Sequence, residues 1–533
     1  MTVPDPSSGH KPKTHTRWHA FLVASGILLS RIAGLIRDRV FAHYFGNSDA
    51  ADAFKAAFRI PNFLQNLFGE GVLSASFIPV YSNLLAHGDR EEAKRVAGAV
   101  AALLMMTTSI LVLLGILITP ILIDAIAPGF EGDKRELCIV LVRILFPGAG
   151  LLVWSAWCLG ILNSHSRFFL SYAAPIIWNA LIIITLLLFG GTMDQFPLSE
   201  TVAWGSVAGS ALQLIIQLPV VLKFVKGMKL SLNFRLSAVR TVIKSFIPVF
   251  ISRGVIQISA YVDSLLASLL PTGAVAALSY AQTLYTLPVS LFGMAVSAAE
   301  LPAMSKAVGS DKEIADQLRT RLNAGLRQIA FFIVPSAMAF LALGDIISSA
   351  IYQTGQFSHD DAEYVWAILA GSAVGLLAST MGRLYSSAFY SLRDTRTPLR
   401  FALLRVALAI MLGYVASQHL PALVGIHRRW GVAGITIASG LCGWIEFALL
   451  RSSLNRRIGK CGLEFRHIAR LWFAAGAGAA GAWAVKLITN QFHPIAQAVL
   501  VLGTYGILYF AMAFIMKIPE VQFLARLTKF YRK

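Results

Sequence analysis

Charged residues are scarce in this chain of 533 residues, where Asp, Glu, Lys and Arg together make up only 14%. A soluble domain is about one quarter charged, so the composition excludes an ordinary soluble class. Cysteine is scarce too, and the four that are present form no close pair and no metal-ligand spacing. We interpret Cys138, Cys158, Cys442 and Cys461 as apolar filler of the core.

Sequence motifs of common enzymes are missing as well. The chain has no Gly-rich phosphate loop ending in Lys-Ser or Lys-Thr, no metal-binding His pair of helical spacing and no GxSxG. We therefore expect neither a catalytic site nor a cofactor, and transport driven by hydrolysis would need a partner subunit.

Long apolar runs are abundant, with 56% hydrophobic residues and a mean hydropathy of +0.66. Runs of about twenty apolar residues predict membrane-spanning helices, because the backbone must satisfy its own hydrogen bonds in lipid. The sequence predicts an all-α polytopic membrane protein with fourteen spans. They lie roughly at residues 18–45, 50–85, 93–126, 136–162, 166–191, 199–224, 240–270, 273–305, 322–351, 361–391, 398–418, 430–454, 467–489 and 493–517.

Two of these runs are expected to be bent or broken inside the membrane. The run 50–85 is too long for one straight helix and contains Pro61, Gly69 and Gly71. The run 273–305 contains two prolines and a glycine in a similar arrangement. Proline removes a helical hydrogen bond, so both runs predict interrupted helices.

Basic residues between the spans indicate the orientation in the membrane. The chain has 46 Lys and Arg, yet the odd-numbered connections hold only Lys134, Arg135, Arg428 and Arg429. This asymmetry predicts that both termini lie in the cytoplasm of a bacterial inner membrane. The polar residues 1–17 predict a cytoplasmic tail and no cleavable signal. Because the net charge of +19 sits in short connections, a nucleic-acid partner is not expected.

An internal repeat divides the chain into two halves. A shift of 224 residues superposes one stretch of the second span on the eighth. The matching residues are Ala53, Ala57, Leu67, Phe68, Gly69, Val72 and Ala75 on Ala277, Ala281, Leu291, Phe292, Gly293, Val296 and Ala299. Two pseudo-symmetric six-helix lobes follow, with a substrate site expected between halves. The predicted division is a tail (1–17), an N-lobe (18–235), a C-lobe (236–460), two extra helices (461–517) and a basic cytoplasmic tail (518–533).

The first two spans carry charged residues at positions expected to lie within the hydrocarbon region of the membrane. Basic side chains outnumber acidic ones among them. A charge at the bilayer centre costs roughly 2.5–3.5 kcal/mol on insertion scales, so these residues should face protein or a watery cavity. An excess of guanidinium groups predicts an anionic ligand, because they bind phosphate oxygens in pairs and stay charged. The charges are Arg31, Arg37, Asp38, Arg39, Asp52, Lys55, Arg59 and Glu70.

Spacing indicates which charges cooperate. Asp52, Lys55 and Arg59 follow one stripe of a helix, so Asp52 can pair with Lys55 and leave Arg59 available. Close to the repeat, a shift of 222 residues aligns Ser30-Arg31 with Ser252-Arg253, so Arg253 is a further candidate. Other intramembrane charges are interpreted as structural ion pairs or interfacial groups: Arg143, Arg383, Arg405 and Lys486.

Several segments resemble the MurJ/MviN family of lipid II flippases. They are SRIAGLIRDRVFAHYFG and DAADAFKAAFRIPNFLQNLFGEGVLSASFIPVY near the N-terminus, APGF at 127–130, AAP at 173–175 and FYSLRDTRTP at 389–398. The resemblance covers essentially the whole chain. It implies a two-lobed fold of the MOP exporter superfamily, shared with MATE transporters, and the substrate lipid II, an undecaprenyl-diphosphate-linked disaccharide-pentapeptide. It also implies a cationic central cavity and a groove for the lipid tail in the two extra helices.

The family's functional positions carry over unevenly. Arg31 and Arg37 match its two first-helix arginines, while Asp52 and Glu70 match acidic positions of the second helix. Arg59 stands where a basic residue is common. Two cavity arginines of some members are Gln65 and Thr283 here.

These departures define the expected substrate site, which consists of Arg31, Arg37, Arg59 and Arg253, with Arg253 replacing the arginine missing at Thr283. A second set, expected to form ion pairs or gates, consists of Asp38, Asp52, Lys55 and Glu70. Some members of the family bind sodium in the C-terminal lobe, where Asp263 is a weak candidate ligand. Coupling to sodium or to the membrane potential therefore stays open.

Three alternatives to a lipid II flippase are weighed. Another exporter of the superfamily, for O-antigen or drugs, is the nearest, although the Arg-rich first span disfavours cationic drugs. A membrane-embedded glycosyltransferase would need an acidic site beside a large outer loop, and the outer connections are short. A non-transporting scaffold is the third. Membrane lipids and the cell-wall synthesis machinery are expected partners of a flippase.

Overall fold

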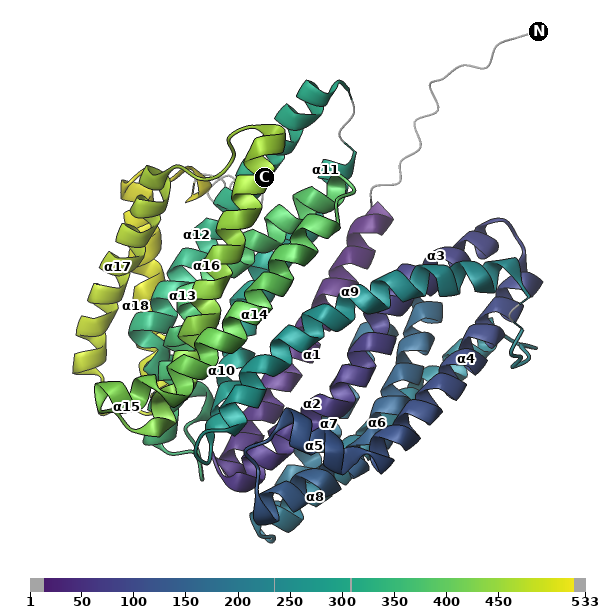
Figure 1. Ribbon diagram of the computed structural model, residues 1–533, viewed down its shortest axis with the longest axis horizontal. Coiled ribbons are helices and arrows are strands. Elements are labelled where there is room, and N and C mark those ends of the chain that lie inside the picture. Colours follow the sequence, from purple (N-terminus) through teal and green to yellow (C-terminus); the bar gives the residue numbers. More distant parts are fainter. Residues whose placement is uncertain (1–13, 234, 307–308, 522–533) are drawn as a thin grey trace. The chain divides into compact units, whose positions relative to one another are not determined.

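The computed structural model describes residues 14–233, 235–306 and 309–521. Within them the chain is almost entirely helical, and the β structure is an isolated bridge between Thr354 and Phe357. The helices fall into two compact units (Figure 1). Unit 1 comprises Met1–Phe41, Ala57–Ile123 and Arg135–Gln257, and unit 2 comprises Ala42–Ala56, Asp124–Lys134 and Ile258–Lys533.

The elements of the first half of the chain supply unit 1 and parts of all three segments of unit 2. They are α1 (Thr14–Phe45), α2 (Asp49–Phe68), α3 (Glu70–Ala86), α4 (Arg90–Leu117), α5 (Thr119–Ile126), α6 (Gly132–Ser164), α7 (Phe168–Phe189), α8 (Gln195–Phe224) and α9 (Ser237–Ser268). The core of unit 1 is formed mainly by α2, α3, α4, α6 and α8, with Phe77 and Ile161 fully buried in it. Trp178 of α7 donates a hydrogen bond to the Ser206 carbonyl oxygen of α8 at 3.1 Å, which joins this pair of helices.

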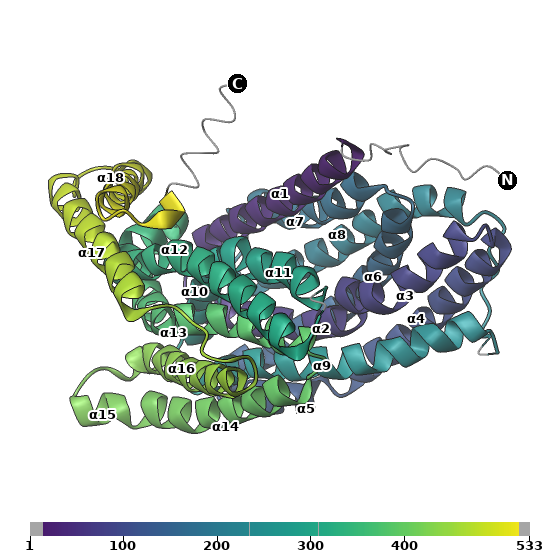
Figure 2. The same cartoon turned by 90° about the horizontal axis from the view of Figure 1, so that it is seen from above.

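Unit 2 contains the remaining helices. They are α10 (Ala274–Pro288), the π-helix η1 (Val289–Met294), α11 (Ala295–Ser305), α12 (Asp311–Tyr352), α13 (His359–Ser391), α14 (Arg396–Gln418), α15 (Leu420–Val424), the 3-10 helix η2 (Arg428–Trp430), α16 (Gly431–Ile458), α17 (Phe465–Ile488) and α18 (Pro494–Ile515). Helices α17 and α18 lie side by side at the edge of this unit and pack on α12 (Figures 1 and 2).

Eleven helices of the described residues are long and apolar enough to cross a membrane. Their outer faces expose large apolar side chains, for example Leu188 at 65% and Ile507 at 72%. Such faces are stable in lipid and unfavourable in water, so the prediction of an all-α polytopic membrane protein is confirmed. Helices α1, α2, α3 and α9 are not among the eleven, and the count of fourteen spans stays a prediction.

Both predicted interruptions are present. Helix α2 ends at Phe68 and α3 begins at Glu70, with Gly69 between them at φ −82° and ψ −153°. A Cβ on Gly69 would lie 2.1 Å from the Gln65 carbonyl oxygen, so this break requires glycine. The second run is divided into α10, the π-turn η1 and α11. A π-turn widens a helix locally and is common at functional sites.

A proline inside α12 is compensated by the C-terminal helix pair. Pro335 has no N–H, so the Phe331 carbonyl oxygen four residues earlier has no helical donor. The Tyr509 hydroxyl of α18 donates to that oxygen at 2.6 Å, and the Tyr505 hydroxyl donates to the Pro335 carbonyl oxygen at 2.7 Å. Because lipid offers no water to satisfy such groups, α18 stabilises the interrupted helix.

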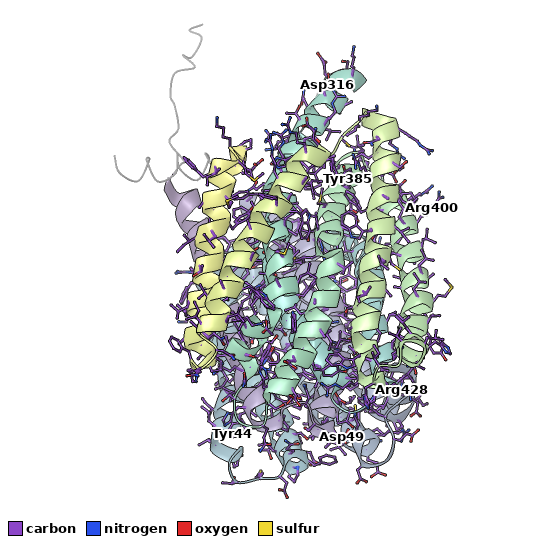
Figure 3. The ribbon with its side chains drawn as sticks, turned by 90° about the vertical axis from the view of Figure 1, so that its left-hand side faces the viewer. Tyr44, Asp49, Asp316, Tyr385, Arg400 and Arg428 are labelled. Carbon is purple, nitrogen blue, oxygen red and sulfur yellow. The ribbon has the colours of Figure 1, made fainter. Side chains whose placement is uncertain are left out.

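The ends of unit 2 follow the predicted alternation of connections. Tyr44, Asp49 and Arg428 lie toward one end of the unit, and Asp316 and Arg400 lie toward the other (Figure 3). The sequence assigns Asp49 and Arg428 to outer connections and Asp316 to an inner one, and it places Tyr44 and Arg400 at the adjoining ends of spans. The end that faces the cytoplasm stays a prediction from the basic connections.

Close packing of α13 on α16 depends on two glycines, and substituting one of them should destabilise unit 2. A Cβ on Gly375 would lie 2.4 Å from the Gly440 Cα atom, whereas a Cβ on Gly443 would meet nothing within 4 Å. We expect Gly375→Ala to separate the helices and cost about 1–3 kcal/mol. The matched change Gly443→Ala should keep or raise stability, because alanine favours a helix. Thermal unfolding in detergent measures both, and equal midpoints for the two variants would contradict this account of the packing.

Candidate functional site

Arg37 is held in a fixed position in unit 1. Its Nη1 donates to the Asn179 Oδ1 atom at 3.1 Å, while Nη2 and Nε donate to Asp38 Oδ1 at 3.0 and 3.3 Å. The guanidinium carbon lies 5.6 Å from the ring centroids of both Phe58 and Trp178. Hydrogen bonds and aromatic rings together keep the charged group oriented. We call Arg37, Asp38, Asn179, Phe58 and Trp178 the arginine cage.

The other two described arginines of the predicted substrate site lie in unit 1 as well. Arg31 is exposed on α1 and makes no hydrogen bond or ion pair with any residue that the structure describes. Arg59 is half-buried on α2, directly after Phe58 of the cage. Arg31 precedes Arg37 by six residues, a rise of roughly 9 Å along a helix. Unit 1 therefore combines one oriented guanidinium, one exposed guanidinium and a third on the neighbouring helix.

Asp52 lies in unit 2, where it binds three partners. Its carboxylate accepts hydrogen bonds from the Gly273 N–H at 2.8 Å and the Ala276 N–H at 2.7 Å. Lys134 Nζ lies 2.6 Å from Asp52 Oδ2 and 2.9 Å from Asp49 Oδ1. Since Asp52 is only 1% exposed, its charge is stabilised by the positive end of α10 and by Lys134. Lys134, which comes from α6, is a partner that the sequence did not predict, and the pairing of Asp52 with Lys55 that the spacing indicated stays a prediction.

Short contacts continue this cluster through unit 2. Lys55 Nζ lies 4.8 Å from the ring centroid of Tyr280, whose hydroxyl donates to the Gly46 carbonyl oxygen at 3.1 Å. Asn47 donates to Asp361 Oδ1 at 3.0 Å. Segment 46–55 is thereby fastened to α10 and to the start of α13. We call the residues around Asp49, Asp52 and Lys134 the acidic clasp.

Gly273 allows the clasp to form. Its φ is +88°, a conformation that other residues rarely adopt, and a Cβ there would lie 2.7 Å from the Asn47 carbonyl oxygen. The backbone can therefore bring its N–H to Asp52 only because this residue is glycine.

Two predicted residues lie outside the described side chains. They are Glu70 and Arg253, whose roles stay predictions. Asp263 is half-buried in unit 2 and accepts a hydrogen bond from Ser439 at 2.8 Å. Within the described part of the chain no three His, Cys, Asp or Glu residues gather as metal ligands. A sodium site at Asp263 therefore stays a prediction.

Two other charges of unit 2, Arg405 and Lys486, form ion pairs of the kind that the sequence indicated. Arg405 Nε lies 3.1 Å from Glu446 Oε2, and Lys486 Nζ pairs with Asp345. These pairs neutralise charge between neighbouring helices.

The FYSLRDTRTP segment forms the connection between α13 and α14. Asp394 accepts hydrogen bonds from the Thr397 N–H at 3.0 Å and the Thr397 hydroxyl at 2.7 Å, and Arg457 lies 2.6 Å away. Burial acts to raise the pKa of Asp394, but the bonds from Thr397 and the Arg457 guanidinium outweigh it and hold that pKa below its usual value. The motif thus caps α14 with a charged carboxylate.

Sequence reasoning missed several residues of both sites. Asn179 and Trp178 lie 142 and 141 residues after Arg37 in the chain, and no local pattern connects them. Lys134 is a different case, because it was one of the few basic residues in the outer connections. That exception to the charge asymmetry was a signal for a specific partner.

Comparisons with known proteins agree with this architecture. A sequence model of the family described as "Lipid II flippase MurJ" matches residues 41–503. A probable lipid II flippase MurJ of Bdellovibrio bacteriovorus is 31% identical over 446 residues, covering 82% of each chain. One of Vibrio cholerae is 28% identical and covers 86% of each chain. The lipid II flippase MurJ of Burkholderia cenocepacia is 29% identical and covers 83% of this chain and 84% of its own.

Solved structures show the same fold. Lipid II flippase MurJ in an inward closed conformation has a TM-score of 0.76 at 24% identity, covering 93% of this chain and 99% of the other. An inward-facing MATE multidrug transporter of the MOP superfamily has a TM-score of 0.62 at 16% identity, covering 82% and 98%. The fold predicted from the sequence resemblance is confirmed.

The acidic clasp predicts that Asp52→Asn destabilises the protein. The amide would aim N–H donors at the N–H groups of α10 and leave Lys134 with only Asp49. Removing one partner of a buried ion pair costs about 3–5 kcal/mol. We expect a clear drop in the thermal midpoint of the purified protein in detergent.

Asp49→Asn is the matched control, because Asp49 binds the same Lys134 but its side chain is 45% exposed. Its midpoint should stay close to that of the unmodified protein. If both variants unfold at the same temperature, the buried carboxylate has no special role.

Proposed function

Because the chain belongs to the lipid II flippase MurJ family, we propose that it moves lipid II from the cytoplasmic to the periplasmic leaflet of a bacterial inner membrane. The observation that carries this proposal beyond the family match is the arginine cage. It orients a guanidinium inside a unit made of membrane helices, with the exposed Arg31 on the same helix.

The chemistry of the cage suits a diphosphate. A guanidinium presents a planar set of N–H donors that bind two phosphate oxygens at once, and it does not lose its proton. The rings of Phe58 and Trp178 are stacked on each other with centroids 5.5 Å apart and form an apolar wall beside it. Such a wall lowers the local dielectric constant and strengthens an ionic hydrogen bond. A cation exporter would instead need carboxylates in excess.

Asp38 can compete with a bound ligand for Arg37 and so allow the ligand to leave. In the described state its carboxylate accepts two hydrogen bonds from Arg37. We propose that the diphosphate takes this place when lipid II binds, and that Asp38 pairs again with Arg37 as the ligand leaves. Translocation then proceeds by alternating access, in which the site faces one side of the membrane at a time.

The membrane potential is the proposed driving force. When one elementary charge crosses a membrane potential of 100 mV, its free energy changes by about 2.3 kcal/mol. A negative interior favours outward movement of the anionic head group. The half-buried Asp263, with its hydrogen bond from Ser439, is the residue to substitute in a test of sodium dependence. No cofactor is part of this mechanism.

The proposed setting follows from the substrate. Lipid II is used outside the membrane by the enzymes of cell-wall synthesis, so contact with that machinery is part of the proposal. The basic inner connections support the assignment of both termini to the cytoplasm. The pair α17 and α18 (residues 465–488 and 494–515) is the proposed support for the lipid tail, since its outer face exposes Leu487, Ile507 and Phe514.

Arg37→Gln tests the proposal directly. Losing a charged hydrogen-bond pair costs about 1.5–3 kcal/mol, so we expect transport to fall roughly 10- to 100-fold. The measurement is the arrival of labelled lipid II at the outer leaflet of cells whose own flippase is depleted. Arg143→Gln should transport normally, because Arg143 is exposed on α6 of the same unit and outside the cage. Normal arrival with Arg37→Gln would refute the proposed role of the cage.

Arg253 supplies a second test, which rests on the sequence. If Arg253 replaces the arginine missing at Thr283, Arg253→Ala should lose transport and the added change Thr283→Arg should restore it in the same assay. Thr283→Arg alone is the control for any harm done by the new side chain. Full activity of Arg253→Ala would exclude the replacement.

A further inference from the structure

Helix α12 departs from regular helical geometry at two places. Pro335 lies inside it without an N–H group, and Leu343 has φ −131° and ψ 15°, which are not helical values. Sharp bends in helices have identifiable causes, and proline and an interrupted hydrogen-bond ladder are two of them. The two positions are eight residues apart, which is roughly 12 Å along a helix. We call them the proline break and the leucine break.

Two tryptophans donate hydrogen bonds at the leucine break. Trp366 of α13 donates from Nε1 to the Phe340 and Leu341 carbonyl oxygens at 3.1 and 3.2 Å. Trp483 of α17 donates from Nε1 to the Ala342 carbonyl oxygen at 2.9 Å. Lipid contains no water that could replace these donors, so the break is stabilised by the neighbouring helices.

The pair α17 and α18 supplies donors at both breaks. The hydroxyl groups of Tyr505 and Tyr509 donate to carbonyl oxygens at the proline break, at 2.7 and 2.6 Å. Trp483 donates at the leucine break, and Lys486 of α17 pairs with Asp345 just beyond it. The polar contacts of this helix pair are therefore placed where α12 is irregular.

These contacts favour the bent form of α12 over a straight one. In a regular helix the same carbonyl oxygens would already accept hydrogen bonds from N–H groups of α12 itself, so the hydroxyl and indole donors would gain less. Polar groups within a membrane bundle are costly when they lack good partners. A group stabilises one of two shapes only if it binds that shape better, and these donors meet that condition.

The proline break also contacts the π-turn η1. The ring of Phe332 stacks on that of Phe292 in η1, with centroids 4.4 Å apart and planes inclined by 6°. Phe331, whose carbonyl oxygen accepts from Tyr509, has its ring centroid 5.8 Å from that of Tyr509. One turn of α12 therefore contacts both α18 and the irregular turn of the neighbouring helix.

We propose that Tyr505, Tyr509 and Trp483 are positioning residues for translocation, because they hold α12 in a bent shape that places the π-turn η1. This role rests on the proposed function and is additional to support of the lipid tail. Removing the bend should therefore impair transport even when the fold itself stays stable.

Pro335→Ala separates the bend from stability. Alanine restores an N–H that can donate to the Phe331 carbonyl oxygen, so the thermal midpoint in detergent should stay equal or rise. Transport of labelled lipid II, in cells whose own flippase is depleted, should fall about tenfold. Pro494→Ala is the matched control, because Pro494 lies in the first turn of α18, where the missing N–H has no helical acceptor. It should change neither quantity.

Tyr509→Phe tests the hydrogen bond at the proline break. Alone, this change removes a donor, so the midpoint should fall and transport should drop about three- to tenfold. In the Pro335→Ala background it should lower the midpoint much less, because alanine then supplies the donor. Tyr414→Phe, at a residue of α14 that is 47% exposed, should change neither quantity.

Trp483→Phe removes the indole donor at the leucine break. Trp483 is 45% exposed, so this variant should fold even if Tyr509→Phe does not. Its transport should also drop about three- to tenfold.

The opposite results would overturn the proposed role. Normal transport by Pro335→Ala would mean that the bend does not matter for translocation, and a lower midpoint would mean that the proline serves the fold. An equal loss of midpoint from Tyr509→Phe in both backgrounds would mean that the hydroxyl does not serve the break. If the unmodified chain moves no lipid II, the proposed function fails and this role fails with it. Normal transport by the unmodified chain and by every variant would reject the role alone.

Discussion

The arginine cage depends on one physical constraint, which is that a permanently charged group within a bundle of membrane helices must be both neutralised and oriented. Arg37 satisfies it with the adjacent Asp38 and with Asn179 on α7. These hydrogen bonds replace the water that would otherwise solvate the guanidinium. The charged group can therefore be stable inside the bundle. Aromatic rings of Phe58 and Trp178 fix the plane of the guanidinium. The proposed transport of an anion extends from this arrangement.

Unit 2 contains a buried charge of the opposite sign, which is also neutralised by its neighbours. Asp52 is buried, and its charge is balanced by Lys134 and by backbone N–H groups at the start of α10. The two sites differ in what remains accessible. The Arg37 side chain is 19% exposed, whereas that of Asp52 is 1% exposed. Access to a ligand therefore distinguishes the cage from the clasp, which holds segments together.

Much of the fold could be predicted from the sequence, because apolar run length, proline and glycine act locally. The break at Gly69 and the irregular stretch from Val289 to Met294 follow from residues that interrupt a helical ladder wherever they occur. The candidate arginines were also predictable, since a charge in an apolar run is conspicuous. Their partners were not, because Asn179 and Lys134 meet them only through the packing of distant helices.

The built-in counter-ion beside Arg37 also bears on which solutes can enter. Any anion must displace a carboxylate that is covalently tethered one residue away, and a tethered group competes at a high effective concentration. Chloride or a single carboxylate offers at most what Asp38 already provides. A diphosphate brings more oxygens and more charge than such anions, so it competes with Asp38 for Arg37 more strongly. In the proposed mechanism, the Arg37–Asp38 pair would therefore keep abundant small cellular anions out of this site.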